Sequence, residues 1–489
     1  MPTNPTTKSQ VQAYRFLLRR MESALVRKDA VLLHEPMRNH LRASAVGLIV
    51  AVLGLAVFFV LGLFKPISKI EGGDIVNVKG TTSVFVVVED AGDEPMRLVP
   101  VLNLTSARLL YAALVPGKQP PETKFVEESA LAGIHRTPVI GLPDAPQTLP
   151  DPKKLIKGDW SVCDTATVRD DLPNAESRPE VATTAVIGTT LGRPLGAAEA
   201  LLVAEQRTGA TFLVWGGHRL PVQLDDGAVT LAYRLDDVVP RKVSTGLLNA
   251  IPEGAALAPP TIPGAGDPAP FRPLTGVRVG DVLRVVLAGE PESFFLVRQH
   301  GVQQVAPAVA NLIRARLGRT DDVQTFTPAA IAEVPKVVNQ QFADFPPQVP
   351  TIHRIAAAPV ACLAWPGTEQ QPVVTVSADG ALLAGKGVEV PGATSGQADR
   401  VFLELGSGAL VRGVVPGQRP DTGQIWLVTE QGLRYGVPSV EVARALGFTE
   451  QPTPAPESIL RLLKSGPALD PDQALAQFDP EQARPRGGR

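Results

Sequence analysis

The chain has 489 residues, a formal net charge of −2, and 44% apolar against 20% charged residues. That length allows roughly two to four domains with buried cores. The near-neutral charge gives no chain-wide attraction for nucleic acid, and two cysteines are too few for a disulfide-rich scaffold or a four-cysteine zinc site. Because the six histidines are also scattered, we expect no metal ion, no cofactor and no nucleic-acid partner.

The first 42 residues are basic and carry an amphipathic helical pattern. They contain eight Lys/Arg and three Asp/Glu, which leaves a net negative charge on the rest of the chain. The cations include Arg15, Arg19, Arg20 and Arg27. Beside them, six apolar residues at helical spacing form one stripe: Val11, Tyr14, Leu17, Leu18, Met21 and Leu25. Such a stripe needs a surface, and anionic lipid and a partner protein are equally open at this point.

A transmembrane helix is predicted from Ala43 to Phe64. These residues contain no charge and are flanked by Arg42 and Lys65. At about 1.5 Å per residue they reach roughly 33 Å, enough to cross a hydrocarbon core of about 30 Å. A soluble helix of this length is normally amphipathic, and a cleaved signal peptide has a shorter apolar core nearer the N-terminus. We therefore expect an uncleaved signal anchor in the lipid bilayer.

The charges and the cysteines together predict the orientation of this anchor. Eight Lys/Arg precede the span, whereas three lysines follow it within the next 20 residues, and cytoplasmic flanks are typically the more basic ones. Cys163 and Cys362 both follow the span, and a lone pair suits an oxidising compartment, with two separate buried thiols as the alternative. We expect the N-terminus in the cytoplasm and the large C-terminal part outside it.

Four segments after the span share one pattern, beginning at Val84, Thr211, Ser293 and Ile425. Each starts with a run rich in β-branched and aromatic residues and turns at a glycine, and three of the four then change to helical spacing. The irregular period excludes a solenoid. Small α+β modules separated by insertions are the favoured interpretation.

Catalytic motifs are not evident. The nearest approach to a phosphate loop is Gly380–Gly387, which follows G-x-x-x-x-G-K but has Gly387 where a Ser or Thr binds Mg²⁺, so we interpret it as a glycine turn between strands. No G-x-S-x-G, S-x-x-K or H-E-x-x-H motif occurs, and Cys163 has no adjacent histidine. Asn103 begins a formal glycosylation sequon, but its position before a helical pattern favours helix capping. We expect no catalytic residues.

Several segments together resemble EccB, the single-pass membrane component of mycobacterial type VII (ESX) secretion systems. The similarity extends over nearly the whole chain. The matching segments are YRFLLRRMESALVRKD from Tyr14, NLTSARLLY from Asn103, IGLPDAP from Ile140, WSVCD from Trp160, STGLLNAIPE from Ser244, APPTIPGAGDP from Ala258 and LRYGVPSVEVARALG from Leu433.

The resemblance implies a fold and a set of partners. It implies an N-terminal cytoplasmic amphipathic helix, one transmembrane helix and a large α+β periplasmic region of β-rich repeat modules around a central domain. One disulfide, for which Cys163 and Cys362 match the family positions, braces the periplasmic part. The implied partners in an oligomeric inner-membrane complex are the EccC ATPase, EccD, EccE and a mycosin protease, and the periplasmic domains are expected to associate with one another.

These expectations divide the chain into ten ranges. They are a cytoplasmic basic helix 1–42, a transmembrane helix 43–64, repeat module one 65–115, the first part of the central domain 116–205, module two 206–250, a Pro-rich extended segment 251–273, module three 274–320, the second part of the central domain 321–420, module four 421–450, and short helices with a disordered tail 451–489.

The leading functional hypothesis is a structural scaffold, because a long folded part outside the cytoplasm carries no catalytic constellation. A membrane-anchored module that binds the cell wall (peptidoglycan) is the alternative, since the repeats of this family have been likened to cell-wall-binding domains of phage lysins. ATP hydrolysis, the label sometimes given to the family, is less favoured because the one near-phosphate loop is incomplete.

Overall fold

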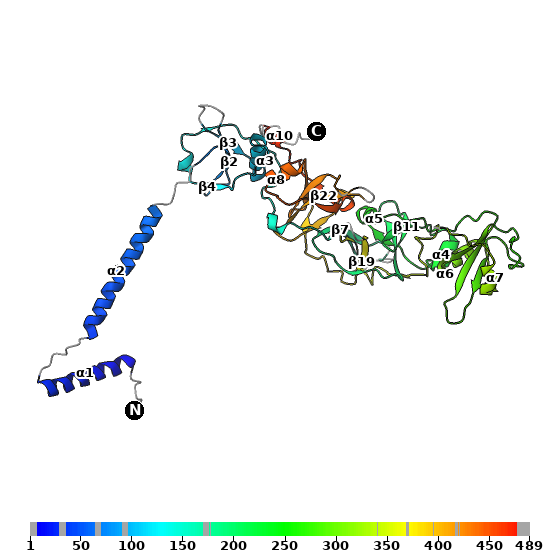
Figure 1. Ribbon diagram of the computed structural model, residues 1–489, viewed down its shortest axis with the longest axis horizontal. Helices are drawn as coiled ribbons and strands as arrows, with labels where there is room; N and C mark the ends of the chain where they lie inside the picture. Colours follow the sequence, from blue (N-terminus) through cyan, green and yellow to red (C-terminus); the bar gives the residue numbers. More distant parts are fainter. Residues whose placement is uncertain are drawn as a thin grey trace. The chain divides into compact units, whose positions relative to one another are not determined.

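The structure, a computed structural model, describes residues 7–476 apart from 29–35, 64–69, 90–95, 170–175, 177, 340, 368–370, 395, 416–418 and 420. It divides into two units, Met1–Ile70 and Glu71–Arg489. The first unit is helical and the second is built from β-sheets with short helices (Figure 1).

The first unit contains α1 (Lys8–Arg27) and α2 (Pro36–Leu63). Thr7 and Gln10 form a capping box at the start of α1, in which each side chain accepts a hydrogen bond from the backbone N–H of the other residue, and Lys28 ends the helix in the left-handed conformation. Within α2, His40–Val60 has a mean hydropathy of 2.7 and is long enough to cross a membrane. Phe64, the predicted end of the span, lies outside the described residues.

Four sheets of the second unit share one topology. In each, three consecutive strands form an antiparallel meander, a helix follows, and the next strand returns parallel to the first. A short helix then leads to a last segment that pairs in parallel with the third strand. We call the strand that returns parallel to the first the closing strand. Because a helix lies between it and the meander in sequence, each sheet and its helices form a compact α+β fold.

The first and second sheets are formed as follows. The first has β1 (Ile75–Val78), β2 (Val84–Val88), β3 (Arg97–Val101), α3 (Leu104–Leu114), β4 (Lys124–Val126), the 3₁₀ helix η1 (Glu128–Leu131) and β5 (His135–Arg136). The second has β9 (Glu199–Glu205), β10 (Thr211–Trp215), β11 (His218–Pro221), α4 (Gly227–Tyr233), β12 (Arg241–Val243), α5 (Thr245–Ala250) and a last bridge between Glu253 and Arg219, and β17 (Thr351–Ile352) joins β9.

The third and fourth sheets repeat this order. The third has β13 (Val282–Val285), β14 (Ser293–Arg298), β15 (Gly301–Val305), α6 (Pro307–Arg316), β16 (Thr325–Phe326), α7 (Pro328–Ala332) and a last bridge between Lys336 and Val302. The fourth has β22 (Gly408–Val414), β23 (Ile425–Thr429), β24 (Leu433–Val437), α8 (Val440–Ala445), β25 (Thr453–Pro456), α9 (Glu457–Leu460) and β26 (Lys464–Ser465), followed by α10 (Pro471–Ala474).

One aromatic residue marks the same position in all four sheets. It lies on the second strand, and a cation covers its ring at 4.4 to 5.6 Å from the centroid. The four pairs are Phe85 with Arg136, Phe212 with Arg219, Phe295 with Lys336 and Trp426 with Arg434. A cation over a ring contributes about 0.5–1 kcal/mol at exposed sites and more when desolvated.

A seven-stranded central sheet joins segments far apart in the chain. Its strands, in spatial order, are β20 (Val388–Glu389), β21 (Arg400–Phe402), β7 (Glu180–Ile187), β6 (Trp160–Thr167), β18 (Val360–Trp365), β19 (Val373–Ser377) and β8 (Arg193–Pro194). At its middle, β6 and β18 run antiparallel, and Cys163 lies directly opposite Cys362. The short 3₁₀ helix η2 (Pro152–Lys154) precedes β6.

Three apolar clusters connect the sheets. The largest contains the central sheet together with Leu247 of α5 and Leu460 of α9. A second joins the second and third sheets through α4 and α6, which lie side by side in Figure 1. A third joins the first and fourth sheets through α3, α8 and α10. The helix that covers each sheet therefore also packs against the helix of another sheet.

The sheets extend beyond the module ranges predicted from the sequence. β4 and β5 lie in the range 116–205 assigned to the central domain, as does β9. β16 and β22 lie in the range 321–420, while β25 and β26 lie in 451–489. The second segment, for which no helix was predicted, also has one, α4. The closing strands were missed because they are only two to four residues long and pair non-locally.

Candidate functional site

The disulfide between Cys163 and Cys362 is present, with an S–S distance of 2.04 Å and a sequence separation of 199. The prediction of one bridge is confirmed, and the alternative of two separate thiols is wrong. Both cysteines are fully buried, packed with Val186, Val360 and Leu383. The bridge closes a loop of about 200 residues, for which chain-entropy estimates give roughly 5 kcal/mol at most.

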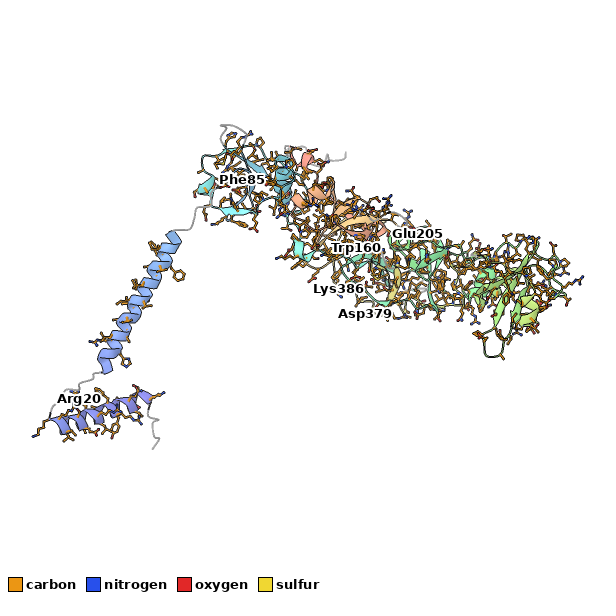
Figure 2. The ribbon with its side chains drawn as sticks, viewed as in Figure 1. Arg20, Phe85, Trp160, Glu205, Asp379 and Lys386 are labelled. Carbon is orange, nitrogen blue, oxygen red and sulfur yellow. A yellow bond between two sulfur atoms is a disulfide. The ribbon has the colours of Figure 1, made fainter. Side chains whose placement is uncertain are left out.

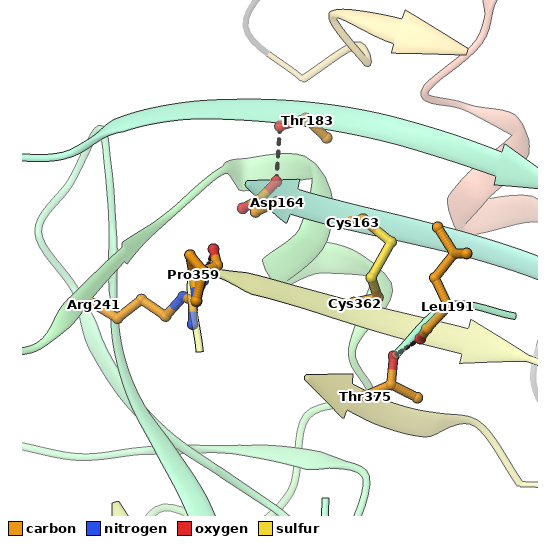
Figure 3. The surroundings of a disulfide bond; sticks show 8 residues. All are labelled: Cys163, Asp164, Thr183, Leu191, Arg241, Pro359, Cys362 and Thr375. Carbon is orange, nitrogen blue, oxygen red and sulfur yellow. Dashed lines mark hydrogen bonds between the residues drawn. A yellow bond between two sulfur atoms is a disulfide. The ribbon is translucent and has the colours of Figure 1, made fainter. Parts of the chain in front are cut away.

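The carboxylate next to this disulfide joins three elements (Figure 3). Asp164 on β6 is fully buried and accepts hydrogen bonds from the Ser244 backbone N–H at 2.6 Å, the Ser244 hydroxyl at 2.9 Å and the Thr183 hydroxyl of β7 at 2.9 Å. The Ser244 hydroxyl in turn accepts from the Leu247 N–H and caps α5. Burial raises the pKa of the Asp164 carboxyl, and the hydrogen bonds from Ser244 and Thr183 oppose that shift.

A buried arginine lies close to this carboxylate (Figure 3). Arg241 of β12 is 1% exposed, and its guanidinium donates to the carbonyls of Ala358 and Pro359, the latter at 2.6 Å. These carbonyls directly precede β18. Burial lowers the pKa of Arg241 to about 10, and the charge of Asp164 opposes the shift. The contact of Asp164 with Ser244 and the contacts of Arg241 with the two carbonyls thus connect the second sheet to both central strands that carry the disulfide.

An exposed ion-pair network joins the same two sheets at another point. The Arg193 guanidinium of β8 donates to both carboxylate oxygens of Glu199 on β9, at 2.7 and 3.0 Å. The Gly196 N–H and the His353 ring also contact Glu199, at 2.7 and 3.0 Å. The bidentate Arg193 contact, helped by Gly196 and His353, lowers the pKa of Glu199 to about 2.

Two of the segments that carry the resemblance, NLTSARLLY and IGLPDAP, contact each other. Asn103 caps α3 by accepting from the Ser106 N–H at 2.8 Å, and its amide donates to the Leu142 carbonyl at 3.1 Å. Thr105 donates to the Pro146 carbonyl at 2.6 Å, and the Leu142 N–H donates to Ser106 at 3.0 Å. Asn103 is 4% exposed, so the predicted capping role explains this residue.

The first and fourth sheets meet through a third such segment. Arg108 of α3 donates to the carbonyl of Leu446, which follows α8 in LRYGVPSVEVARALG. Gly141 has φ of +130°, and a Cβ there would lie 2.7 Å from the Ser106 hydroxyl. Only glycine allows this close approach without strain. The contact of Arg108 with Leu446 therefore joins two of the segments that carry the sequence resemblance.

The Gly380–Gly387 segment is a turn between β19 and β20. A phosphate loop leads from a strand into a helix whose N-terminal N–H groups bind the phosphates; here a strand follows instead. Leu383 inserts beside the disulfide, the Lys386 side chain is exposed (Figure 2), and a Cβ on Gly387 would lie 2.8 Å from the Val401 carbonyl oxygen. The prediction of a glycine turn is confirmed.

The residues predicted in the first unit are exposed. Each stripe residue of α1 is between 39% and 82% exposed, with Val11 and Leu25 at the two ends of this range. Arg15, Arg19, Arg20 and Arg27 lie on the same helix. Within α2, Ala43 lies inside the apolar window, and the large apolar residues around it are exposed.

Asp164, Arg241 and Ser244 were not singled out from the sequence. The available signal was a charged residue inside an apolar strand, since Asp164 follows Cys163 in WSVCD, and buried charges are normally paired. Arg241 and Ser244 gave no comparable signal, because their contacts are more than 75 residues away in sequence. Among the residues that the structure describes, no group of His, Cys, Asp and Glu is arranged to hold a metal ion.

A helix long and apolar enough to cross a membrane, followed by sheets joined through a disulfide, buried polar contacts and capped helices, is typical of a membrane-anchored structural protein. The comparison with known families agrees. Residues 3–481 match the family T7SS_ESX1_EccB, described as "Type VII secretion system ESX-1, transport TM domain B", and the chain belongs to this family.

Individual relatives are similar over nearly their whole length. The chain is 32% identical to "ESX-1 secretion system ATPase EccB1" of Mycolicibacterium smegmatis (strain MKD8), covering 98% of this chain and 97% of that protein. It is 31% identical to "ESX-3 secretion system ATPase EccB3" of Mycolicibacterium smegmatis (strain ATCC 700084 / mc(2)155), covering 99% and 93%. Their names contain the word ATPase, but nothing in the geometry of the Gly380–Gly387 turn supports catalysis.

Two solved structures have the same fold. A chain of an intact ESX-5 inner membrane complex matches with a TM-score of 0.71 and 28% identity, covering 100% of this chain and 98% of that chain. A chain of the EccB3 dimer from the ESX-3 core complex matches with a TM-score of 0.69 and 28% identity, covering 82% and 100%.

Proposed function

We propose that this chain is a scaffold subunit of a type VII secretion complex in the bacterial inner membrane. The observation that carries the proposal is that the buried polar side chains bind other elements of the same chain. Asp164, Arg241, Asn103 and Thr105 each bind backbone or side chains of a different element. Such contacts hold separate elements in place, and those of Asp164 and Arg241 join the second sheet to the central sheet.

The orientation of the anchor follows from two features. The disulfide lies in the unit after α2, and disulfides persist in oxidising compartments. The basic residues Arg15, Arg19, Arg20 and Arg27 lie before α2, and cytoplasmic flanks are enriched in cations. In our proposal the N-terminus is cytoplasmic, α2 crosses the membrane once, and Glu71–Arg489 lies in the periplasm.

The second unit is proposed to consist of four repeat modules around a central domain. The shared strand order and the aromatic–cation pair at one position support an origin by duplication. Self-association of this periplasmic part is supported by the EccB3 dimer of the ESX-3 core complex. By family membership, the proposed partners are the EccC ATPase, EccD, EccE and a mycosin protease.

Deleting residues 1–64 tests the scaffold proposal. We expect a soluble, folded periplasmic part that no longer joins the membrane complex when co-expressed with the partner subunits. Replacing 43–64 by an unrelated transmembrane helix is the control that separates anchoring from sequence-specific contacts within the membrane. Full assembly of the complex with the deleted chain would contradict the proposal.

ATP hydrolysis, the activity in the names of the relatives, can be tested directly at Lys386. If the turn held a nucleotide, Lys386→Ala would abolish turnover by the purified chain. We expect no turnover by the unmutated chain and no change with Lys386→Ala. Phosphate release that is lost in this variant, but retained in the exposed control Lys464→Ala, would contradict the assignment as a structural subunit.

A further inference from the structure

The helix α1 has an apolar stripe that nothing in the described residues covers. None of its residues is buried, and Tyr14, Met21 and Leu25 are 65%, 60% and 82% exposed. A 20-residue helix with a capping box at one end and a left-handed residue at the other has defined limits, so the stripe is a continuous surface along its length. Large apolar side chains at i, i+3 and i+7 spacing gain free energy when they leave water.

The cations of α1 border this stripe on both sides. At 3.6 residues per turn, Lys8, Arg15 and Arg19 follow one border, whereas Arg20 and Arg27 lie beyond the other. With a single acidic residue among the 20, the helix is strongly cationic. Arginine stems can lie along apolar surface while the guanidinium groups reach outward, so both borders suit a layer of anionic groups above a layer of hydrocarbon.

The chain also limits how far α1 can move from the membrane. Eight residues lie between Arg27 and Pro36, the first residue of α2. Because an extended chain advances at most about 3.6 Å per residue, α1 begins within roughly 30 Å of the end of the transmembrane helix. Tethering at this distance gives the stripe a high effective concentration of lipid.

We infer that α1 lies on the cytoplasmic lipid surface, with the stripe Val11, Tyr14, Leu17, Leu18, Met21 and Leu25 in the interface and the arginines on anionic headgroups. This assignment goes beyond the scaffold role, because it concerns the chain alone and needs no other subunit. A helix bound in this way restrains the rotation of α2 about its axis and its movement along the membrane normal.

The experiment uses the full chain in lipid nanodiscs, without partner proteins. Because both native cysteines are in the disulfide, Leu18→Cys provides one reactive thiol for an environment-sensitive fluorophore. Gln12→Cys, on the opposite face of the same helix, is the matched control, and Leu25→Cys gives a second stripe position. Discs of phosphatidylglycerol with phosphatidylcholine are compared with discs of phosphatidylcholine alone, and accessibility is measured by iodide quenching.

We expect the labels at residues 18 and 25 to be protected from iodide in the anionic discs, and the label at residue 12 to remain accessible. Each cation near an anionic surface contributes about 1 kcal/mol, so Arg15→Gln and Arg19→Gln each lower the bound-to-free ratio about fivefold there, and not in neutral discs. Equal accessibility of residues 12 and 18 in both discs overturns the inference and assigns the stripe to a protein partner. Protection without any dependence on lipid charge or on the arginines overturns the headgroup contact.

Discussion

The four sheets fall into two pairs that differ in how their second short helix is used. In the second and fourth sheets, α5 and α9 place Leu247, Leu248 and Leu460 in the core of the central sheet. In the first and third sheets, the corresponding η1 and α7 bury one residue each, Leu131 and Ile331.

The aromatic–cation pairs divide in the same way. In the second and fourth sheets the cations, Arg219 and Arg434, come from the third strand. In the first and third sheets they come from the last segment, which pairs with the third strand. One fold therefore serves two roles. In the sheets attached to the centre, the second helix buries two large aliphatic side chains, whereas in the peripheral sheets it buries one. The additional apolar burial supplies free energy for attachment to the centre.

Replacing the buried Asp164 is the strongest test of the attachment of the second sheet to the central sheet. We expect Asp164→Ala to lower the free energy of unfolding by about 3–5 kcal/mol, because it leaves the buried donors of Ser244 and Thr183 without their acceptor and removes a negative charge that favours the Arg241 cation. Urea unfolding of the full chain in detergent, followed by tryptophan fluorescence, measures this change. Asp151→Ala, which removes a cap from an exposed 3₁₀ helix, is the control and should cost about 1 kcal/mol or less. Equal midpoints would refute the central role of Asp164.

The contribution of α9 to the central core can be tested with a core substitution and a surface control. Leu460→Ala removes a fully buried side chain from the central core and should cost about 2–5 kcal/mol. Ser129→Ala, on the exposed side of η1, should change stability by about 0.5 kcal/mol or less. The same unfolding assay distinguishes them. If both variants unfold at the same urea concentration, Leu460 does not stabilise the central core.

Removing the disulfide tests the middle of the central sheet. Cys163→Ser with Cys362→Ser should cost about 2–4 kcal/mol, since the unfolded chain regains the freedom of the long loop. Non-reducing gels should show a mobility shift for the unmutated chain that reductant abolishes and that the single variant Cys163→Ser lacks. Identical mobility with and without reductant would contradict the bridge.

The smallest expected effect is a pH dependence of stability, caused by the exposed ion-pair network between β8 and β9. Because Arg193 lowers the pKa of Glu199 from 4.5 to about 2, this group stabilises the folded state fully above about pH 4.5 and loses that contribution as the pH falls to about 2. Glu199→Gln should remove this part of the acid sensitivity in melting curves. Glu389→Gln, in the exposed pair with Arg400, serves as the control. An unchanged acid profile in Glu199→Gln would show that the network does not stabilise the junction.

Local patterns predicted those elements that are defined by their own residues. The second strands at Val84, Thr211, Ser293 and Ile425 are present because β-branched and aromatic runs favour strands. The helix α4 was missed, since it has seven residues and begins at a glycine. Closing strands such as β12 were missed for another reason: three residues carry too little periodicity, and their stability comes from a partner strand about 40 residues away.

The sequence by itself determined the charge-free span, the cationic amphipathic helix before it and the presence of two cysteines after it, because hydropathy, charge and spacing along the chain are local properties. Only the tertiary structure decided that Cys163 lies opposite Cys362, that Asp164 and Arg241 share one buried site, and which sheets surround the centre. Those outcomes depend on strand pairing between distant segments and on desolvation, and neither is encoded in any short stretch of residues.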